Sequence, residues 1–376
     1  MGGRGSTPDS GGRAGPPFEV NVLLYIILAI LLFGFLIAVH EGGHFAAAKL
    51  LGVQVNEFAI GMGPKIFSRK KGVTQYSLRA IPIGGYCAME GEEEDSQDPG
   101  SFLAKPVWKR FIILTAGSFM NYVAGLLILL LIFAQIPQFT VPVISSFLDG
   151  FPYESEAGLL PGDRIVSVDG HRIFVFADIS TYFAASNGET MDLVIERNGQ
   201  MIERKNFPLK PQNYLVDGKM QKKYGLNFTK VDATPGLVLK QSWNTSWYFA
   251  RAVWSGLGSL IEGKANLKDL SGPVGIVSIV EQTGAQSANV GIAIQNILYI
   301  IALIAVNLAI VNMLPIPALD GGRIFFMLLT EGYFLLFGRK PDPKYEGYLH
   351  MAGFVLLMLL MVVVTWNDIV KLVTRT

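Results

Sequence analysis

Four long apolar stretches divide the chain and predict helices that cross a membrane. The first, residues 22–39 (VLLYIILAILLFGFLIAV), contains no charge and has about the length that a helix needs to cross the hydrocarbon core. The others are Phe111–Ile136, Val290–Leu314 and a stretch that begins with Met351–Trp366 and extends to about Leu372. The pattern therefore predicts four transmembrane helices.

Between the second and third stretches, residues 140–231 alternate between apolar and polar positions over short runs. In GLLPGDRIVSVDG (158–170), a Pro-Gly-Asp turn precedes a strand at 165–168, and Asp-Gly supplies a hairpin turn. MDLVIERNGQMIERKNF (191–207) repeats this pattern around Asn-Gly, and a helix is expected over 178–186. The segment is predicted to be a small inserted β-rich domain.

Three further segments have distinct patterns. Residues 1–17 are rich in Gly, Ser, Pro and Arg, which is typical of a disordered tail. Residues 64–90 alternate and break at Gly84-Gly85, which indicates a strand pair that must be buried in protein or line a wet cavity, because lipid cannot satisfy its backbone. Residues 243–262 are amphipathic, which is typical of a helix on the membrane surface.

These patterns divide the chain into five parts. They are a tail (1–17), two membrane helices with the strand pair (18–139), the β-rich domain (140–231), an amphipathic linker region (232–289) and two final membrane helices (290–376).

Composition agrees with a membrane location. Hydrophobic residues make up 51% of the chain and charged residues 16%, whereas soluble proteins carry about 25% charge. The net charge of +1 provides no basic field for binding nucleic acid. The single cysteine, Cys87, excludes an internal disulfide.

Basic residues near the apolar stretches predict the orientation of the chain, because cytoplasmic loops are enriched in lysine and arginine. They are Lys49, Lys65, Arg69, Lys70, Lys71, Arg79, Lys105, Lys109 and Arg110 between the first two stretches, and Arg323, Arg339, Lys340 and Lys344 between the last two. Both loops are therefore expected in the cytoplasm. Both chain ends and residues 137–289 are expected outside it.

A candidate metal site lies at the end of the first apolar stretch. Two of the four histidines, His40 and His44, flank Glu41 in HEGGH. Residues four apart share one face of a helix, so both imidazoles can reach one zinc ion, and the glutamate can accept a proton from the attacking water. Ionisable groups within a membrane span cost roughly 3 kcal/mol each and mark functional sites. A catalytic zinc is predicted, since four closing ligands for a structural zinc are not evident nearby.

A catalytic zinc normally has three protein ligands, so one more must come from elsewhere. His171 lies in the β-rich domain, and His350 begins the fourth span near the cytoplasmic face. Asp320, in NMLPIPALDGGR (312–323), follows the third span, which crosses the membrane in the same direction as the first. Asp320 is therefore expected at the depth of the two histidines. A helix N-cap alone would not explain that position.

Six motifs carry a resemblance to a known family. They are HEGGH (40–44), GMGPKIF (61–67), IPIGGYCAMEGE (81–92), AGSFMNYVAG (116–125), SGPVGI (271–276) and NMLPIPALDGG (312–322). With these motifs, in this order, the chain resembles the site-2 proteases, the intramembrane zinc metalloproteases of regulated intramembrane proteolysis, in their bacterial RseP-type branch. The β-rich insert resembles a single PDZ domain. The chain departs from the family at Met62, Ser118 and Arg323, where phenylalanine, proline and histidine are common.

The resemblance implies a fold and a set of site residues. The fold would be a polytopic α-helical membrane protein with a membrane-reentrant β-loop and an inserted PDZ-like domain. Zn²⁺ would be bound by His40, His44 and Asp320, with Glu41 as the general base. The β-loop would pair with an unwound substrate as an added strand. The implied substrate contacts are Asn312, Asn307, Gly84, Gly85 and Tyr86.

The resemblance also implies an activity and a location. The chain would be a metalloendopeptidase of the bacterial cytoplasmic membrane that cleaves single-span membrane proteins, of the anti-sigma factor or remnant signal peptide class. Its active site would lie near the cytoplasmic side, with the PDZ-like domain outside as a size filter against bulky substrates. The lipid bilayer and a transmembrane substrate would be its partners, without nucleic acid.

Alternatives remain for the whole chain and for two of its parts. A pseudoprotease scaffold is disfavoured by the intact HExxH and Asp320, and a transporter by the few spans and the lack of visible inverted repeats. The β-rich domain has the alternative role of docking a C-terminus. Gly42 and Gly43, poor helix formers, are expected to allow close helix packing or substrate approach. The substrate, the oligomeric state and the roles of Cys87 and Arg323 stay open.

Overall fold

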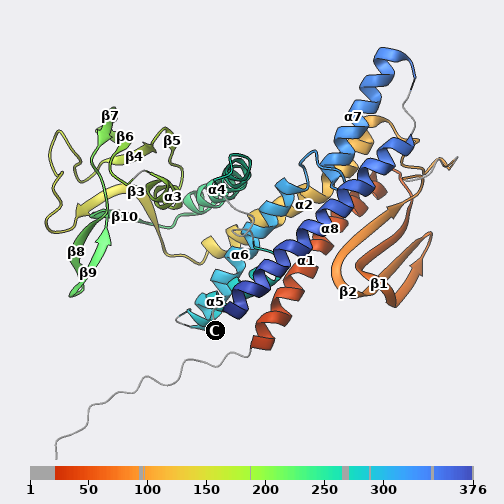
Figure 1. The fold of residues 1–376 in the computed structure, drawn as a ribbon, viewed down its shortest axis with the longest axis horizontal. Helices are drawn as coiled ribbons and strands as arrows, with labels where there is room; N and C mark the ends of the chain where they lie inside the picture. Colours follow the sequence, from red (N-terminus) through yellow and green to blue (C-terminus); the bar gives the residue numbers. More distant parts are fainter. Residues whose placement is uncertain are drawn as a thin grey trace, which may run out of the picture.

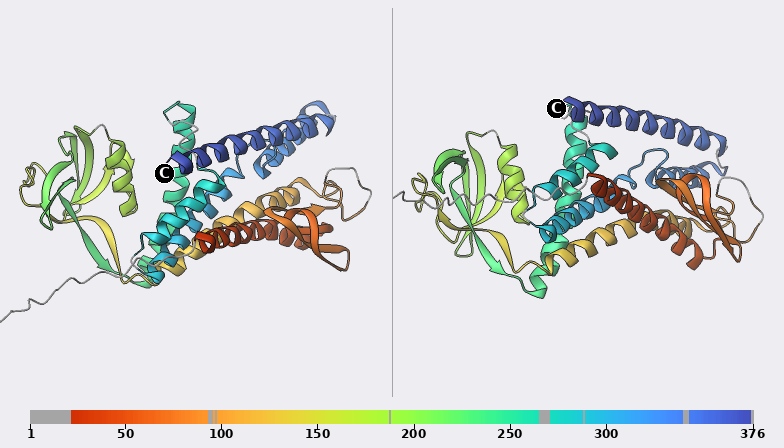
Figure 2. Two further views of the ribbon diagram at one scale, coloured as in Figure 1. Left: turned by 60° about the horizontal axis from the view of Figure 1, so that its bottom comes forward. Right: turned by 90° about the horizontal axis from the view of Figure 1, so that it is seen from below.

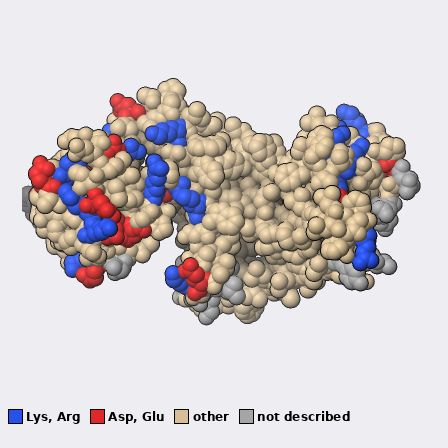
Figure 3. Space-filling model, turned by 90° about the horizontal axis from the view of Figure 1, so that it is seen from above, with Lys and Arg blue, Asp and Glu red and all other residues tan. Residues whose placement is uncertain are grey.

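The computed structural model describes residues 22–92, 96, 98–186, 188–264, 271–287, 289–339 and 343–374. The predicted tail, 1–17, lies outside the described residues. Within them, four helices are long and apolar enough to cross a membrane: Ile30–Leu50, Val107–Phe133, Val290–Val311 and Gly347–Thr374. Charged side chains gather at the two ends of the molecule and leave a broad uncharged middle (Figure 3). The chain is thus built as a multi-pass membrane protein, as predicted.

The first membrane helix is longer than the apolar stretch that predicted it. Helix α1 (Val22–Leu50) continues through HEGGH, so both histidines lie within a helix. It ends because Gly52 takes a left-handed conformation with φ of 77°, which lets the Val53 amide bond to the Ala48 carbonyl at 2.8 Å. The extension carries the histidines beyond the apolar residues while keeping their spacing on one face.

Helix α2 (Val107–Phe133) packs against both α1 and α6 (Val290–Val311), and the three form the centre of the helical part (Figures 1 and 2). Helix α2 starts before the predicted Phe111, directly after Pro106, whose missing N–H is no loss at a helix start. Helix α6 ends at Val311 rather than Leu314. These two boundaries correct the sequence prediction by a few residues.

The loop expected between the third and fourth spans is largely helical, which corrects the prediction. Helix α7 covers Asp320–Phe337, and α8 covers Pro343–Thr374. Helix α7 is amphipathic, with Arg323 and Glu331 among its apolar residues, so it lacks the uninterrupted apolar stretch that predicts a membrane span. Its first residue is Asp320, and the chain leaves it at Gly338 with φ of 69°.

Strands β1 (Val55–Lys71) and β2 (Thr74–Met89) form the predicted strand pair, but its extent differs from the prediction. The pair begins at Val55 rather than residue 64, and β2 continues through Gly84-Gly85 instead of breaking there. Gly84, with φ of 79°, bends the strand without ending it.

Both strands of this pair fold back on themselves. Residues 57–60 pair on one side with 75–78 and on the other with 85–88. Residues 85–88 therefore form a strand at one edge of this pair, and this segment is called the outer strand. Helix α1 lies beside β2.

The β-rich domain contains an antiparallel sheet with the strand order β10-β3-β4-β6-β7, in which β5 pairs with β4. Its strands are β3 (Gln138–Phe147), β4 (Arg164–Val168), β5 (His171–Arg172), β6 (Met191–Arg197), β7 (Gln200–Phe207) and β10 (Leu226–Asp232). A separate hairpin is formed by β8 (Gln212–Val216) and β9 (Lys219–Lys223). The hairpin turns at Asp169-Gly170 and Asn198-Gly199 occur where the sequence placed them.

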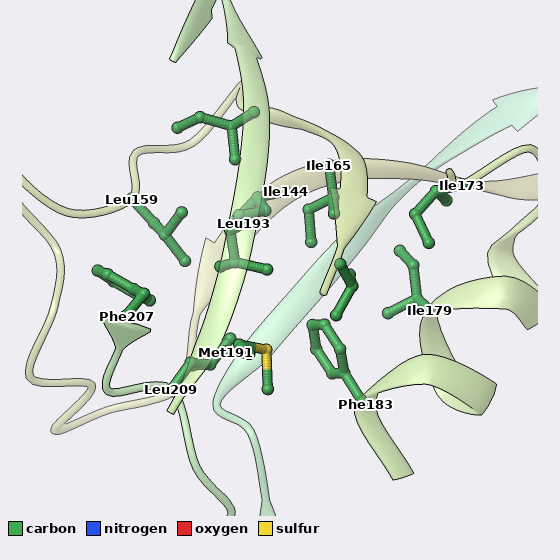
Figure 4. Packing of buried hydrophobic residues seen from close by; sticks show 12 residues of the cluster. Ile144, Leu159, Ile165, Ile173, Ile179, Phe183, Met191, Leu193, Phe207 and Leu209 are labelled. Atoms are coloured by element: carbon green, nitrogen blue, oxygen red, sulfur yellow. The ribbon is translucent and has the colours of Figure 1, made fainter. Parts of the chain in front are cut away.

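This domain has a hydrophobic core of its own. Ile165 and Leu193 of the sheet face Ile179 and Phe183 of α3 (Phe176–Ala185), and all four side chains are buried (Figure 4). Alternate residues of each strand supply this core, as the period-two pattern predicted.

Two helices occupy the region predicted as an amphipathic linker, and the first of them covers most of the amphipathic residues 243–262. They are α4 (Pro235–Ile261) and α5 (Pro273–Ala285). Helix α4 packs on α2 and α6 with a buried face that includes Ser242 and Ser246, and Tyr122 of α2 hydrogen-bonds Ser246 at 2.9 Å. An ion pair of 2.8 Å joins Arg251 of α4 to the fully buried Asp178 of α3 and holds the β-rich domain against this helix.

Candidate metal centre

Two histidines of α1 and the first residue of α7 converge, although Asp320 lies 280 positions after His40 in the chain. The two Nε2 atoms are 3.2 Å apart, and Asp320 Oδ2 lies 3.2 Å from His40 Nε2 and 3.3 Å from His44 Nε2. The ligand atoms of all three residues lie within 4.8 Å of one another. The structure therefore brings together the three residues predicted as metal ligands.

The donor set fits a zinc ion. Asp320 Oδ2 is buried and has no hydrogen-bond partner among the described residues, although it lies close to both imidazole nitrogens. A buried hydrogen-bond acceptor without a partner is costly, and a cation bound between the three side chains would remove that cost. Two imidazole nitrogens and one carboxylate oxygen are the ligand types of catalytic zinc sites.

The Nδ1 atom of each imidazole lies within hydrogen-bonding distance of a group of α2. His44 Nδ1 lies 2.8 Å from the Ile113 carbonyl, to which it donates, so that its Nε2 keeps a lone pair for a metal. His40 Nδ1 lies 3.3 Å from the amide of Asn121. The Asn121 oxygen is buried and has no hydrogen-bond partner within the described ranges, and turning the amide over would let it accept from His40 Nδ1.

Asn121 was absent from the predicted site. Its signal in the sequence was a polar side chain inside the apolar second span. That signal shows that such a residue is functional, but only the packing of α2 on α1 shows that it serves His40.

Glycines let α1 and α2 approach each other at this site. A Cβ atom on Gly43 would lie 2.4 Å from the Ala116 carbonyl oxygen, and one on Gly117 would lie 2.3 Å from His44 Nε2. A Cβ atom on Gly42 would meet nothing within 4 Å. Close packing is thus the role of Gly43, whereas Gly42 faces open space.

A tight turn places Asp320 beside the histidines. The Gly321 amide donates to the Asn312 carbonyl at 2.7 Å, and Ala318 takes φ of 76°. His350 of α8 accepts a hydrogen bond from the Ala318 amide at 3.0 Å on Nδ1. His350, one of the alternatives for the third ligand, therefore contacts the turn that carries Asp320. Leu319, not Asp320, is the N-cap of α7.

The other sequence candidates lie at different places. His171 stacks on Tyr182 within the β-rich domain, with ring centroids 4.5 Å apart. Asn312 is half-buried at the end of α6, and its backbone is joined to the Asp320 turn. Asn307 is exposed on α6.

Glu41 lies against the outer strand. A Cβ atom on Gly85 would be 3.1 Å from Glu41 Cγ and 2.9 Å from Ile37 Cγ2, so only glycine allows this approach. In the described part of the chain, the outer strand pairs with β1 alone, which leaves its second edge without a strand partner. The catalytic candidate and an open strand edge are therefore neighbours.

Tyr86 of the outer strand belongs to a polar network on the strand pair. Arg79 donates to the Tyr86 hydroxyl and, at 2.9 Å, to Glu57, and Ser77 donates to Glu57 at 2.6 Å. Burial opposes ionisation of Glu57, but these hydrogen bonds outweigh it and hold the pKa of Glu57 at about 2. The network fixes Glu57 as an anion and attaches the outer strand to the inner ones.

Residues 28–360 match the family model described as Peptidase family M50. The chain belongs to this family. M50 comprises the site-2 proteases, so the resemblance of the motifs is confirmed across most of the chain.

Three relatives illustrate the similarity of this M50 chain. A provisionally named zinc metalloprotease of Clostridium perfringens is 37% identical over 350 residues, covering 92% of this chain and 99% of that protein. Zinc metalloprotease RasP of Geobacillus kaustophilus is 30% identical over 435 residues, covering 94% of this chain and 99% of that protein. Regulator of sigma-W protease RasP of Bacillus subtilis is 28% identical over 432 residues, covering 92% of this chain and 98% of that protein. The M50 chain is thus a zinc-dependent metalloendopeptidase with membrane helices.

Proposed function

We propose that His40, His44 and Asp320 hold the zinc ion, and that Glu41 is the general base in the hydrolysis of a membrane-embedded peptide bond. One observation carries this assignment: three ligand atoms from α1 and α7 lie within 4.8 Å of one another. Glu41 lies between the two histidines in the chain and against an open strand edge.

Zinc bound by these residues would acidify a water molecule and polarise the scissile carbonyl. Glu41 accepts the proton of the attacking water and returns it to the leaving amine. Ile113 and Asn121 keep the imidazole rings oriented, so their Nε2 atoms stay directed at one point. The burial of His44 limits the access of bulk water to this point.

The substrate binds in this proposal as an added strand. A transmembrane helix hides its carbonyls in its own hydrogen bonds, so it must unwind, and its freed backbone groups then need partners. The open edge of the outer strand offers such partners, and Gly84 and Gly85 keep the approach free of side chains. The side-chain amides of Asn312 and Asn307 supply further contacts to the substrate backbone.

We further propose the substrate class and the orientation in the membrane. The Bacillus subtilis relative is named as a regulator of sigma-W, which supports single-span substrates of the anti-sigma factor class; remnant signal peptides are the second class. The end of the molecule that holds β1, β2 and α7 is mostly basic on the face shown in Figure 3, which supports a cytoplasmic position for the site. Strands β1 and β2 are then a membrane-reentrant β-loop.

The β-rich domain is in this proposal an extracytoplasmic PDZ-like size filter that excludes substrates with bulky outer domains. Its attachment through Arg251 and Asp178 supports a fixed position beside the membrane helices. Deletion of residues 140–231 tests the role. Cleavage of untrimmed substrate by the deletion variant supports the filter, and loss of all cleavage supports a docking domain instead.

One experiment tests the proposed activity. The protein is purified in detergent, its zinc content is measured, and a single-span peptide is incubated with the wild type and with Glu41→Gln. We expect about one zinc ion per chain in both and cleavage by the wild type only. Equal cleavage by the two proteins would refute the assignment of Glu41.

A further inference from the structure

Arg323 follows Asp320 by three residues and so lies on the same side of α7, one turn further along. Its guanidinium donates to Glu92 Oε1, a residue that follows the last strand residues of β2. The chain thus carries an ion pair between the helix that supplies a metal ligand and the segment that leaves the outer strand.

Glu92 is placed to act on the outer strand. Its second oxygen, Oε2, accepts a hydrogen bond of 3.2 Å from the backbone amide of Met89, the last residue of β2. One carboxylate therefore bonds both the end of β2 and the first turn of α7. Its side chain is 12% exposed, so water screens the pair only in part.

The pair is linked to the proposed catalytic base through β2. Glu92 bonds the end of β2, and on the same strand a Cβ atom on Gly85 would lie 3.1 Å from Glu41 Cγ. Apolar packing also joins α7 to β2, because Ile324 and Met327 of α7 share one buried cluster with Cys87 and Met89 of β2. Apolar contacts hold the parts together but set no single spacing, whereas a hydrogen-bonded ion pair fixes direction and distance.

We propose that the Arg323–Glu92 pair sets the spacing between Asp320 and the outer strand, and thereby selects which peptide bond of a bound substrate strand meets the metal. Arg323 and Glu92 are positioning residues in this proposal, because neither touches the reacting atoms. The proposal rests on the function proposed above, in which the substrate pairs with the outer strand.

The physical consequence is a change in cleavage position. A substrate strand held by backbone hydrogen bonds can shift along its partner, and shifts of two residues keep each side chain on the same face. When the outer strand is fixed relative to Asp320, one register places a carbonyl at the metal. When the pair is broken, neighbouring registers compete.

A double-mutant cycle with cleavage-site mapping tests the proposal. Arg323→Gln, Glu92→Gln and the double variant are purified in detergent with the wild type, and the cleavage products of a single-span peptide are identified by mass spectrometry. Each single variant is expected to cut at two or more positions and to raise KM about tenfold, at unchanged zinc content. The double variant is expected to be no worse than either single variant, because the pair is already lost.

A second ion pair of α7 provides a matched control. Arg110 of α2 donates to Glu331 at 2.8 Å, so Arg110→Gln also removes an arginine that pairs with a glutamate and ties α7 to its neighbours. Because Glu331 lies toward the other end of α7, this variant is expected to cut at the wild-type position.

The outcomes separate the two proposals. A wild type that does not cleave, or a Glu41→Gln variant that cleaves equally, refutes the proposed function. If wild type cuts at one position and Glu41→Gln does not cut, two results overturn the positioning role alone: an unchanged cleavage position in Arg323→Gln, or additive effects in the cycle. Loss of activity that parallels loss of zinc in Arg323→Gln also overturns it.

Discussion

Gly117 offers a sharp test of the metal centre, because two effects of adding one methyl group there have opposite signs. In a helix interior, Gly→Ala normally stabilises by about 1 kcal/mol through lower backbone entropy loss. At Gly117, however, the new Cβ atom would lie 2.3 Å from His44 Nε2 and 2.8 Å from His40 Cε1. Zinc–nitrogen bonds are about 2.0–2.1 Å long, so the methyl group would crowd the region that the ion needs.

His44 cannot move away from this methyl group without losing a hydrogen bond and its position as a metal ligand. Turning its ring away breaks the 2.8 Å hydrogen bond from Nδ1 to the Ile113 carbonyl and moves Nε2 off the point shared with His40 and Asp320. Loss of a supporting contact of a zinc ligand costs 10–100-fold in affinity. With the ligand itself displaced, we expect Gly117→Ala to weaken zinc binding by about 100-fold, or about 2.7 kcal/mol.

The assay is a titration of the purified protein with a zinc chelator, with thermal unfolding measured alongside. Gly125→Ala is the control, since Gly125 lies on the same helix and its new Cβ atom would be 2.9 Å from Val306 Cγ2 of α6, away from the metal ligands. We expect Gly125→Ala to lose stability while keeping its zinc. If Gly117→Ala holds zinc as tightly as the wild type, the ligand geometry derived above is wrong.

Three further predictions concern other parts of the structure. Asn121→Leu removes the group that orients His40 and should lower zinc affinity 10–100-fold without unfolding α2, as measured by the same chelator titration; unchanged affinity would contradict this role. The pKa of Glu57 is lowered from 4.5 to about 2, because hydrogen bonds from Ser77 and Arg79 outweigh the burial that opposes ionisation. The stabilisation from Glu57 is therefore complete above about pH 4.5 and lost as the pH falls toward 2. Hydrogen-exchange protection of β1 and β2 should decline over that range in the wild type, and a Glu57→Gln variant with the same decline would argue against it. Burial and the nearby Glu41 raise the pKa of Cys87 to about 12, so iodoacetamide should alkylate the folded protein far more slowly than the denatured one at about pH 8; equal rates would count against this burial.

The sequence predicted those features that depend on local pattern. Uninterrupted apolar stretches located the four membrane helices, and the spacing of HEGGH placed both imidazoles on one helical face. The expected membrane depth of Asp320 favoured it over His171 and His350 as the third ligand, and the structure brings Asp320 to the two histidines.

Features that depend on contacts between distant segments were outside the reach of that pattern. Helix α7 was missed because its charges interrupt the apolar residues, and the fold-back of β1 and β2 depends on pairing that glycine positions alone do not encode. The contacts of Asn121 with His40 and of Glu92 with Arg323 join residues 81 and 231 positions apart. Only the packed structure shows such partners.

In the proposed mechanism, Glu41 performs proton transfer at a zinc ion held by His40, His44 and Asp320. The most direct measurement is zinc content together with cleavage rate in Glu41→Gln, a change that keeps the size of the side chain and removes its basic carboxylate. We predict about one zinc ion per chain and a cleavage rate at least about 100-fold below that of the wild type. A variant that retains its zinc and cleaves the single-span peptide at the wild-type rate would contradict this role of Glu41.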